Sequence, residues 1–337
     1  MSFIIALPVA FLLTWAARYL GLATGMVDRP AAAPPPGGRA LKIHARPVPV
    51  LGGVAVLAAV VATLFAVQGR VPVLVTAGVA LAALVGLADD VRPLGASSRM
   101  LALALAGVLL VAGGVRLVPL GWFRATGVIV LVLLLTNAVN LIDGQDGLAS
   151  GLAALAGLGL ATLNFTHGGD GVAALAFVGA LLGFLAWNLP PARVFLGNSG
   201  AYGLGALLAV LAAHASDEHR WPGLFGAGLC LAVFAFELCF TVGRRLAARE
   251  RLATGDRRHS YDLLARASGS RTRTTLLLWC VGAVASTAGV LLGQLPAAVD
   301  AWLVGAAMAL GTVAGVLLWQ LALAQECAAL PVEDQTQ

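Results

Sequence analysis

Apolar runs about as long as a bilayer is thick recur along almost the whole chain, and this repetition restricts the fold more than any other feature. Each run meets the requirement of roughly 20 residues for one helical span, and the runs lack the alternating pattern of outer-membrane strands. Because 60% of the 337 residues are apolar and only 11% are charged, the chain has too little polar surface to cover a soluble globule. The sequence therefore predicts an all-α, polytopic integral membrane helix bundle.

We expect about eleven transmembrane helices from these runs. Their centres fall near residues 12, 58, 80, 106, 132, 156, 178, 207, 232, 284 and 311. The fifth and sixth spans are the hardest to delimit, because the polar stretch from Asn137 to Asp146 runs into both. The longest polar segment, from about Gly243 to Thr275, is a connector between the ninth and tenth spans.

The basic residues are distributed unevenly over the loops. Loops that follow odd-numbered spans hold 16 of the 21 Lys and Arg residues, whereas the even loops hold Arg70, Arg116, Arg124 and Arg220, and Arg18 lies in the first span. By the positive-inside rule the odd loops are cytoplasmic, with the N-terminus outside and the C-terminus inside. The net charge of +5 is thus mainly a topology signal beside membrane lipid, and it does not argue for nucleic acid.

With this topology, four polar clusters share the cytoplasmic face: Lys42 to Arg46, Asp89-Asp90, Asn137 to Asp146, and His259 to Asp262. The first runs from Lys42 to Arg46, and its cations are suited to hold phosphate. The second is the pair Asp89 and Asp90 at the end of the third span, where burial of a carboxylate is costly. Two adjacent carboxylates at a helix end suit a divalent cation or a general base.

The stretch from Asn137 to Ala149 is the most informative part of the chain. If its first part is helical, Asn137, Asn140 and Asp143 repeat at i, i+3 and i+6 and roughly share one face. Lipid packing gives no reason for these amides and carboxylates, so we expect Asn137, Asn140, Asp143 and Asp146 to serve a site. Gly144 and Gly147 permit a sharp reversal into the next span.

One further element and the fourth cluster fall on the same face. Phe195 to Gly203, with the sequence FLGNSGAYG, opens the eighth span with a glycine-rich turn that is a plausible phosphate cradle at a helix N-terminus. Gly255 to Leu264 brings His259 together with Arg and Asp side chains inside the long connector. Convergence of these clusters on one face indicates a polar site at the membrane surface.

In motif order from about Asp28 to Asp262, the chain resembles the polyprenyl-phosphate N-acetylhexosamine-1-phosphate transferases. The resemblance implies transfer of a sugar 1-phosphate from a UDP-sugar to undecaprenyl phosphate, with release of UMP. It also implies a multi-pass protein of the bacterial inner membrane whose active site faces the cytoplasm. Residues 1–325 would then form a single transmembrane catalytic domain, followed by a short polar tail at 326–337.

The resemblance also implies roles for individual residues. Asp89, Asp90 and His259 correspond to catalytic positions, and deprotonation of the lipid phosphate is one role for the aspartate pair. The positions that correspond to nucleotide-sugar binding are Lys42, Asn137, Asn140, Asp143, Asp146 and Phe195. Mg²⁺, with Mn²⁺ as a substitute, would be held by Asp90, Asp143 and Asn198 and would stabilise the charge on departing UMP.

Asn198 departs from the family pattern, in which an aspartate at this position ligates the metal. A neutral amide supplies no charge, which leaves a catalytically impaired relative that binds only nucleotide-sugar or lipid as one alternative. A transporter is another, but it would place its polar residues near the bilayer midplane.

The connector sequence from Arg257 to Asp262 lacks the consecutive histidines of the muramyl-pentapeptide branch. It therefore favours the amino-sugar branch, which primes O-antigen, lipopolysaccharide or other wall polymers. The small residues on the predicted helix faces would also allow a homodimer.

Overall fold

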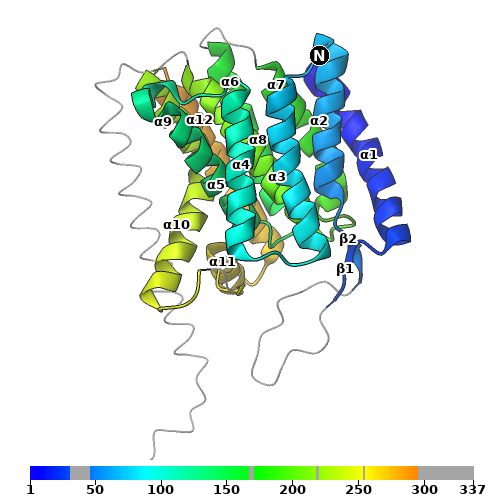
Figure 1. Ribbon diagram of the computed structural model, residues 1–337. Coiled ribbons are helices and arrows are strands. Elements are labelled where there is room, and N and C mark those ends of the chain that lie inside the picture. The colour runs from blue at the N-terminus through cyan, green and yellow to red at the C-terminus, as the bar shows by residue number, and fades with distance from the viewer. Residues whose placement is uncertain (31–45, 167–170, 218–219, 253–254, 295–337) are drawn as a thin grey trace, which may run out of the picture.

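The computed structural model describes residues 1–30, 46–166, 171–217, 220–252 and 255–294. Within these ranges the chain is a bundle of long helices with one short pair of strands (Figure 1). The elements in chain order are α1 Ser2–Thr24, β1 Val27–Asp28, β2 Val48–Pro49, α2 Gly52–Gln68, α3 Val73–Val91, α4 Ala96–Ala112, η1 Val118–Phe123, α5 Arg124–Ile142, α6 Leu148–Thr166, α7 Val172–Asn188, α8 Gly197–Asp217, α9 Arg220–Cys230, α10 Ala232–Ala247, α11 Ser260–Ser268 and α12 Arg271–Leu292.

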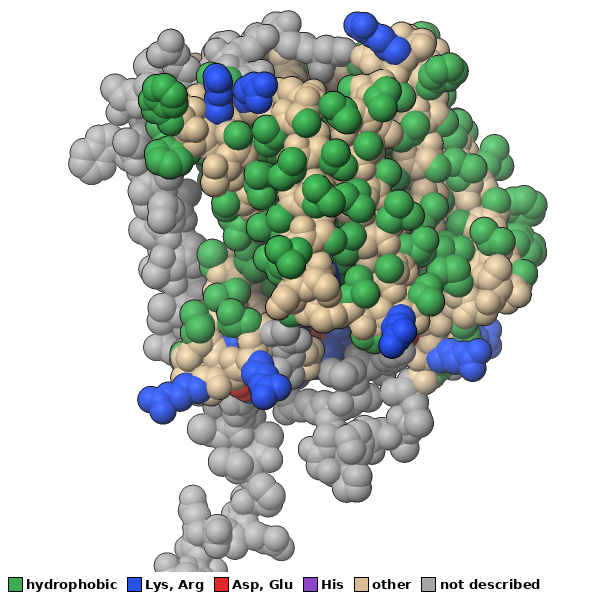
Figure 2. All heavy atoms as spheres, in the orientation of Figure 1, with side chains coloured by type: hydrophobic (Ala, Val, Ile, Leu, Met, Phe, Trp, Pro, Cys, Tyr) green, Lys and Arg blue, Asp and Glu red, His purple; other side chains and the backbone are tan. Residues whose placement is uncertain are grey.

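The prediction of a mostly helical chain with several apolar helices that can span a membrane is confirmed. Six helices are long and apolar enough to cross a membrane, and a seventh span results if the bent pair α9 and α10 counts as one. The three helices α2, α4 and α7 are apolar but have only 17 residues each. Arginine side chains lie at the two ends of the molecule, whereas apolar side chains cover its flank (Figure 2), as expected for a surface in contact with lipid.

The number of spans and the orientation of the termini stay predictions. Ten of the eleven expected centres fall within helices of the described chain. The eleventh, near residue 311, lies outside the described residues. The expected ninth span differs from a straight helix, because α9 and α10 meet at Leu231 with a bend of 70°. The second half of this run carries Glu237, Arg244 and Arg245, which suit a polar surface better than the centre of a bilayer.

Helix α8 forms the centre of the bundle and contacts α2, α3, α5, α6 and α9. Its neighbours approach closely because glycines line the contacts. A Cβ atom on Gly53 would lie 2.0 Å from the Cα of Gly200, and one on Gly86 would lie 2.2 Å from the carbonyl oxygen of Asn198. Helices α2 and α3 are therefore fixed against the first turn of α8.

Two elements were not expected from the sequence. Strands β1 and β2 pair antiparallel, with Val27 opposite Pro49 and Asp28 opposite Val48, so the chain is not purely α-helical. The long connector after α10 contains the helix α11, which lies with β1 and β2 at the lower end of the bundle in Figure 1. We call this end of the bundle the site end.

Candidate active site

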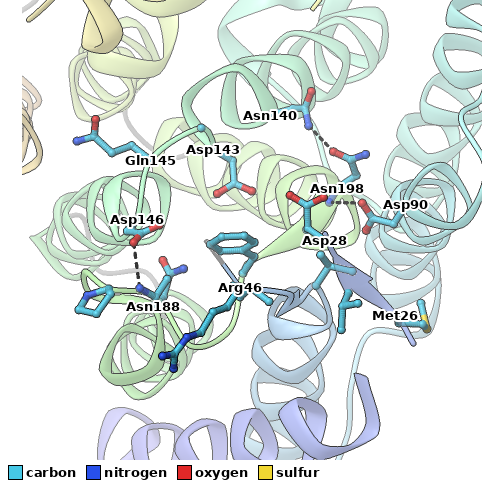
Figure 3. A pocket seen from close by; sticks show the side chains of 18 of the residues that line it. Met26, Asp28, Arg46, Asp90, Asn140, Asp143, Gln145, Asp146, Asn188 and Asn198 are labelled. Atoms are coloured by element: carbon cyan, nitrogen blue, oxygen red, sulfur yellow. Dashed lines mark hydrogen bonds between the residues drawn. The ribbon is translucent and has the colours of Figure 1, made fainter. Parts of the chain in front are cut away.

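A cavity of about 1410 Å³ lies at the site end of the bundle. Its wall comes from segments far apart in the sequence, from the end of α1 to the start of α12. The charged residues that line it are four aspartates and three arginines: Asp28, Asp90, Asp143, Asp146, Arg46, Arg257 and Arg271. Figure 3 shows Asp28, Asp90 and Asn198 on one side of the cavity and Asp146 and Arg46 on another.

Asp90 caps the central helix. Its Oδ1 accepts a hydrogen bond of 3.0 Å from the backbone N–H of Asn198, and its Oδ2 accepts one of 3.2 Å from the N–H of Ser199. A carboxylate at a helix N-terminus satisfies donors that lack an intrahelical partner and interacts favourably with the helix dipole. Asp90 is thereby held in place while it lines the cavity.

Asp89 lies behind the cavity wall and does not line the cavity. Its Oδ1 accepts from the N–H of Leu94 at 2.7 Å, and its Oδ2 lies within 3.4 Å of Arg99 Nη1, 3.3 Å of Tyr202 Oη and 3.1 Å of Asn198 Nδ2. Its side chain is only 8% exposed. With four donors around one carboxylate, Asp89 is paired inside the protein instead of being open to a substrate.

Asn198 connects two of the clusters predicted from the sequence, the Asp89-Asp90 pair and the stretch that contains Asn140. Its Nδ2 donates to Asp89, and its Oδ1 accepts a hydrogen bond of 2.8 Å from Asn140 Nδ2. The amide thus matches an acceptor on one side and a donor on the other. A carboxylate at this position would have no proton to offer Asp89.

The loop between α5 and α6 presents its carboxylates to the cavity. Asp143 receives no hydrogen bond from the residues that the structure describes, so both of its oxygens are open to a ligand (Figure 3). Burial raises the pKa of Asp143 well above its usual value, and the nearby charges of Asp90 and Asp146 act in the same direction. Asp146 is anchored differently, since its Oδ2 accepts from the N–H of Ala192 at 2.9 Å.

Phe195 is held in the cavity by its backbone. Its N–H donates to the carbonyl of Pro49 at 2.8 Å, and its carbonyl accepts from the N–H of Gly52 at 3.1 Å. Phe195, the aromatic residue that lines this cavity, offers a flat face on which a planar base can stack.

The first turn of α11 and the residues just before it hold the end of α5 and the α5–α6 loop. Tyr261 Oη donates to the carbonyl of Leu141 at 3.1 Å, and Arg257 Nη1 donates to the carbonyl of Gly144 at 3.1 Å. Arg257 also lies 3.7 Å from Asp262 Oδ1. Arg257 is therefore both a lining residue and a link between the long connector and the loop that carries Asp143.

His259 lies outside the cavity. Its Nδ1 is 2.9 Å from Glu237 Oε1 of α10, and its ring stacks on Tyr261 with 5.3 Å between centroids. Glu237 is buried and also accepts hydrogen bonds from Thr241 and Ser260. His259 thus joins α10 to α11 in this structure, and its contact with phosphate stays a prediction.

The sequence-predicted residues divide into two groups. Six of them line the cavity: Asp90, Asn140, Asp143, Asp146, Phe195 and Asn198. Three do not: Asp89, His259 and Asn137, whose Nδ2 donates to the carbonyl of Leu133 at 2.7 Å. Lys42 lies outside the described residues.

Sequence reasoning assigned no role to Asp28, Gln145 or Arg271, which also line the cavity. Asp28 could have been noticed as an isolated carboxylate just after an apolar run. Arg271 carries no such signal, because it is one of several arginines in the long connector region.

The residues present fit a hard divalent cation. Carboxylate oxygens are the ligands that Mg²⁺ takes, and Mg²⁺ is usually held by one or two carboxylates together with substrate phosphates. Asp143 supplies a carboxylate that has no hydrogen-bond or ion-pair partner in the described part of the chain, and Asp90 lines the same cavity. No group of three or more His, Cys, Asp or Glu residues in the described chain is close enough to form a complete site, and Asn198 Oδ1 already accepts from Asn140.

Comparisons with known proteins identify the family. Residues 72–216 match the model of glycosyl transferase family 4. An undecaprenyl-phosphate alpha-N-acetylglucosaminyl 1-phosphate transferase of Thermotoga maritima is 30% identical over 272 residues, which cover 80% of this chain and 83% of that protein. The chain belongs to glycosyl transferase family 4.

Other members of the family are similar over long stretches. A probable undecaprenyl-phosphate N-acetylglucosaminyl 1-phosphate transferase of Bacillus subtilis is 26% identical over 312 residues, covering 87% of this chain and 84% of that protein. A phospho-N-acetylmuramoyl-pentapeptide-transferase of Moorella thermoacetica is 33% identical over 241 residues, covering 62% and 72%. The matched residues 72–216 include Asp90, Asn140, Asp143 and Asn198, so the family match covers much of the cavity wall.

Proposed function

We propose that this chain transfers an N-acetylhexosamine 1-phosphate from a UDP-sugar to undecaprenyl phosphate. An oxygen of the lipid phosphate attacks the phosphorus that carries the sugar, and the bond between that phosphorus and the oxygen of the UMP phosphate breaks. UMP leaves with the electron pair, and the lipid carries the sugar through a new diphosphate. The relatives in Thermotoga maritima and Bacillus subtilis have names that state transfer of this kind.

The observation that carries the proposal is the composition of the cavity. Carboxylates, asparagine amides, an aromatic ring and arginines line one space at the end of a membrane bundle. Arginine guanidinium groups bind phosphate oxygens, an aromatic face stacks on a base, and carboxylates hold a divalent cation. A nucleotide diphosphate needs all three, and a lipid phosphate reaches such a site at the membrane surface.

Asp90 and Asp143 are the carboxylates best placed to act on the reacting groups. Asp90 is fixed by the first turn of α8, and Asp143 has both oxygens open to the cavity. A fixed carboxylate that lines the cavity can take the proton of a lipid phosphate or hold its oxygen in line for attack. Asp89 acts through the groups that it holds, Asn198 and Arg99, and not on the substrate directly.

Asp143 and Asp90 would hold Mg²⁺ together with the substrate phosphates. When bound, the ion would neutralise charge on the diphosphate and on the departing UMP. Arg46 and Arg257 would share this task from the cationic parts of the wall, and Phe195 would stack on the uracil ring.

The site end would face the cytoplasm. This orientation follows from the excess of Lys and Arg in the loops that flank the cavity residues. It would give the soluble UDP-sugar and the lipid phosphate access to the same surface, and the protein would prime a wall or surface polysaccharide from the cytoplasmic side of the plasma membrane.

An exchange assay with purified protein tests the proposal. Undecaprenyl phosphate and MgCl₂ are supplied with a panel of UDP-hexosamines, and UMP and the lipid-linked sugar are followed. Formation of both products with one donor supports the transferase and identifies its sugar. Binding of UDP-sugar without product from any donor would instead support the impaired relative and contradict the transfer reaction.

A further inference from the structure

Arg271 is the first residue of α12 and lines the cavity from a helix that no sequence motif singled out. Its guanidinium forms no ion pair with any acidic residue of the described chain. The side chain is solvent-exposed. Among the residues that the structure describes, no carboxylate therefore lies within ion-pair distance of the Arg271 guanidinium at the cavity wall.

Gln145 fixes the position of this arginine. The Gln145 Nε2 donates to the carbonyl of Arg271 at 2.7 Å and to Thr275 Oγ1 at 2.6 Å. Gln145 is buried, and in the sequence it lies between Asp143 and Asp146. Its side chain therefore links the first turn of α12 to the loop that presents both carboxylates. Thr275 adds a weaker link, since its hydroxyl lies 3.5 Å from the carbonyl of Asp146.

Arg257 provides a second cation near Arg271. The two guanidinium groups line the same cavity and interact as like charges, while Asp146 and Asp262 attract Arg271 from farther away. Arg257 is partly neutralised by Asp262 at 3.7 Å, whereas Arg271 has no such partner in the described chain. An anion between these two groups would remove their mutual repulsion and would bind through charge-assisted hydrogen bonds.

We propose that Arg271 binds a phosphate group of a substrate and that Gln145 is its positioning residue. The phosphate comes either from the diphosphate of the UDP-sugar or from the head of the lipid acceptor, which share the same oxygen chemistry. The inference rests on the proposed transferase function for the identity of these substrates, but the binding step can be measured without turnover.

Arg271→Gln in the full-length protein tests the first part. Binding of UDP and of uridine is measured by calorimetry in detergent, and the KM for undecaprenyl phosphate is measured in the exchange assay. Loss of one charge-assisted contact is expected to cost about ten- to a hundredfold. If the donor supplies the phosphate, UDP weakens by this factor and uridine does not; if the lipid supplies it, only the KM for undecaprenyl phosphate rises.

Arg273→Gln is the matched control, because Arg273 lies on the same turn of α12 but does not line the cavity. It removes the same charge from the same end of α12 and is expected to change neither quantity by more than about twofold. Unchanged UDP binding and unchanged KM in Arg271→Gln, or equal losses in both variants, would overturn the proposal. Weakened UDP binding in Arg271→Gln, with no transfer by the unmodified protein, would refute the transferase and leave this inference standing.

Gln145→Leu tests the positioning role, since it keeps the volume and removes both donated hydrogen bonds. We expect it to weaken the same ligand as Arg271→Gln, with kcat changed less than KM. Residues that act through one another are not additive, so the double variant should bind no worse than Arg271→Gln alone. Additive losses would show that Gln145 supports the fold in general and does not act through Arg271.

Discussion

Asn198→Asp probes the amide that links Asp89 to Asn140. In the structure Asn198 Nδ2 lies 3.1 Å from Asp89 Oδ2, and Asp89 is only 8% exposed. The substitution replaces a donated hydrogen bond with a second carboxylate at about the same separation. We expect the metal-free protein to lose stability, although the change introduces the carboxylate that the resemblance implies for metal binding at this position.

The size of this loss follows from the distance. Two unit charges 3.1 Å apart repel by ~5 kcal/mol at an effective dielectric constant of about 20. Rearrangement of Arg99 toward the pair and movement of the new side chain will reduce the repulsion. A net destabilisation of at least about 2 kcal/mol remains, comparable to the loss of one hydrogen bond to a charged group.

Thermal unfolding of the detergent-purified protein measures this effect with and without MgCl₂. Without metal, the Tm of Asn198→Asp should fall by several degrees, roughly 2 to 4 °C per kcal/mol for a chain of moderate size. Added MgCl₂ should raise the Tm of the variant more than that of the unmodified protein, because an ion that binds only the folded state stabilises it.

Asn137→Asp is the matched control. It introduces the same charge on α5, at a residue that does not line the cavity. It should not gain a larger metal response. An unchanged Tm for Asn198→Asp in the absence of metal would refute the view that the hydrogen bond from this amide to Asp89 stabilises the fold. A reduced Tm with no additional response to MgCl₂ would place the position outside the metal site.

Four further outcomes are expected. Asp90→Asn should lower turnover in the exchange assay at least about a hundredfold, given the usual contribution of a general base; near-normal turnover would remove it from the mechanism. Phe195→Ala should raise the KM for the UDP-sugar about tenfold through lost stacking, whereas Phe195→Tyr should not. Although burial acts in the opposite direction, the hydrogen bond from Arg244 lowers the pKa of Asp256 below its usual value, so the stability that this carboxylate contributes is present above pH ~4 and is lost as the pH falls further; Asp256→Asn should flatten this part of a Tm-against-pH curve. A reporter fused after Gln337 should read as cytoplasmic, and an external signal would contradict the predicted topology.

The membrane bundle could be predicted from the sequence because hydropathy reports burial in lipid residue by residue. The bend at Leu231 could not, since the run on both sides of it is long enough to form one straight span. The helix α11 was also missed. Its amphipathic sequence is short and charged, and its position depends on Tyr261 and Arg257 reaching the carbonyls of a loop more than a hundred residues earlier.

The α5 end of the site was predicted in part. Asn137, Asn140 and Asp143 were expected to share a face, yet only Asn140 and Asp143 line the cavity. A helix turns by 100° per residue, so three residues bring a side chain back to within about 60°, but six residues leave it about 120° away. The i, i+3, i+6 pattern therefore joins neighbours in the series and separates its ends, and Asn137 turns toward the Leu133 carbonyl and Met100.

The same geometry explains why Asp89 and Asp90 do not act as an equivalent pair. Consecutive residues at the end of α3 point about 100° apart, so both carboxylates cannot face one cavity. Asp90 faces the cavity and caps α8, while Asp89 turns toward Tyr202 and Arg99. Asn198 connects the two, because its backbone N–H binds Asp90 and its side chain binds Asp89. A substitution at Asp89 should therefore affect the reaction indirectly, by moving the first turn of α8 and with it Asp90. It should not act by removing a second proton acceptor.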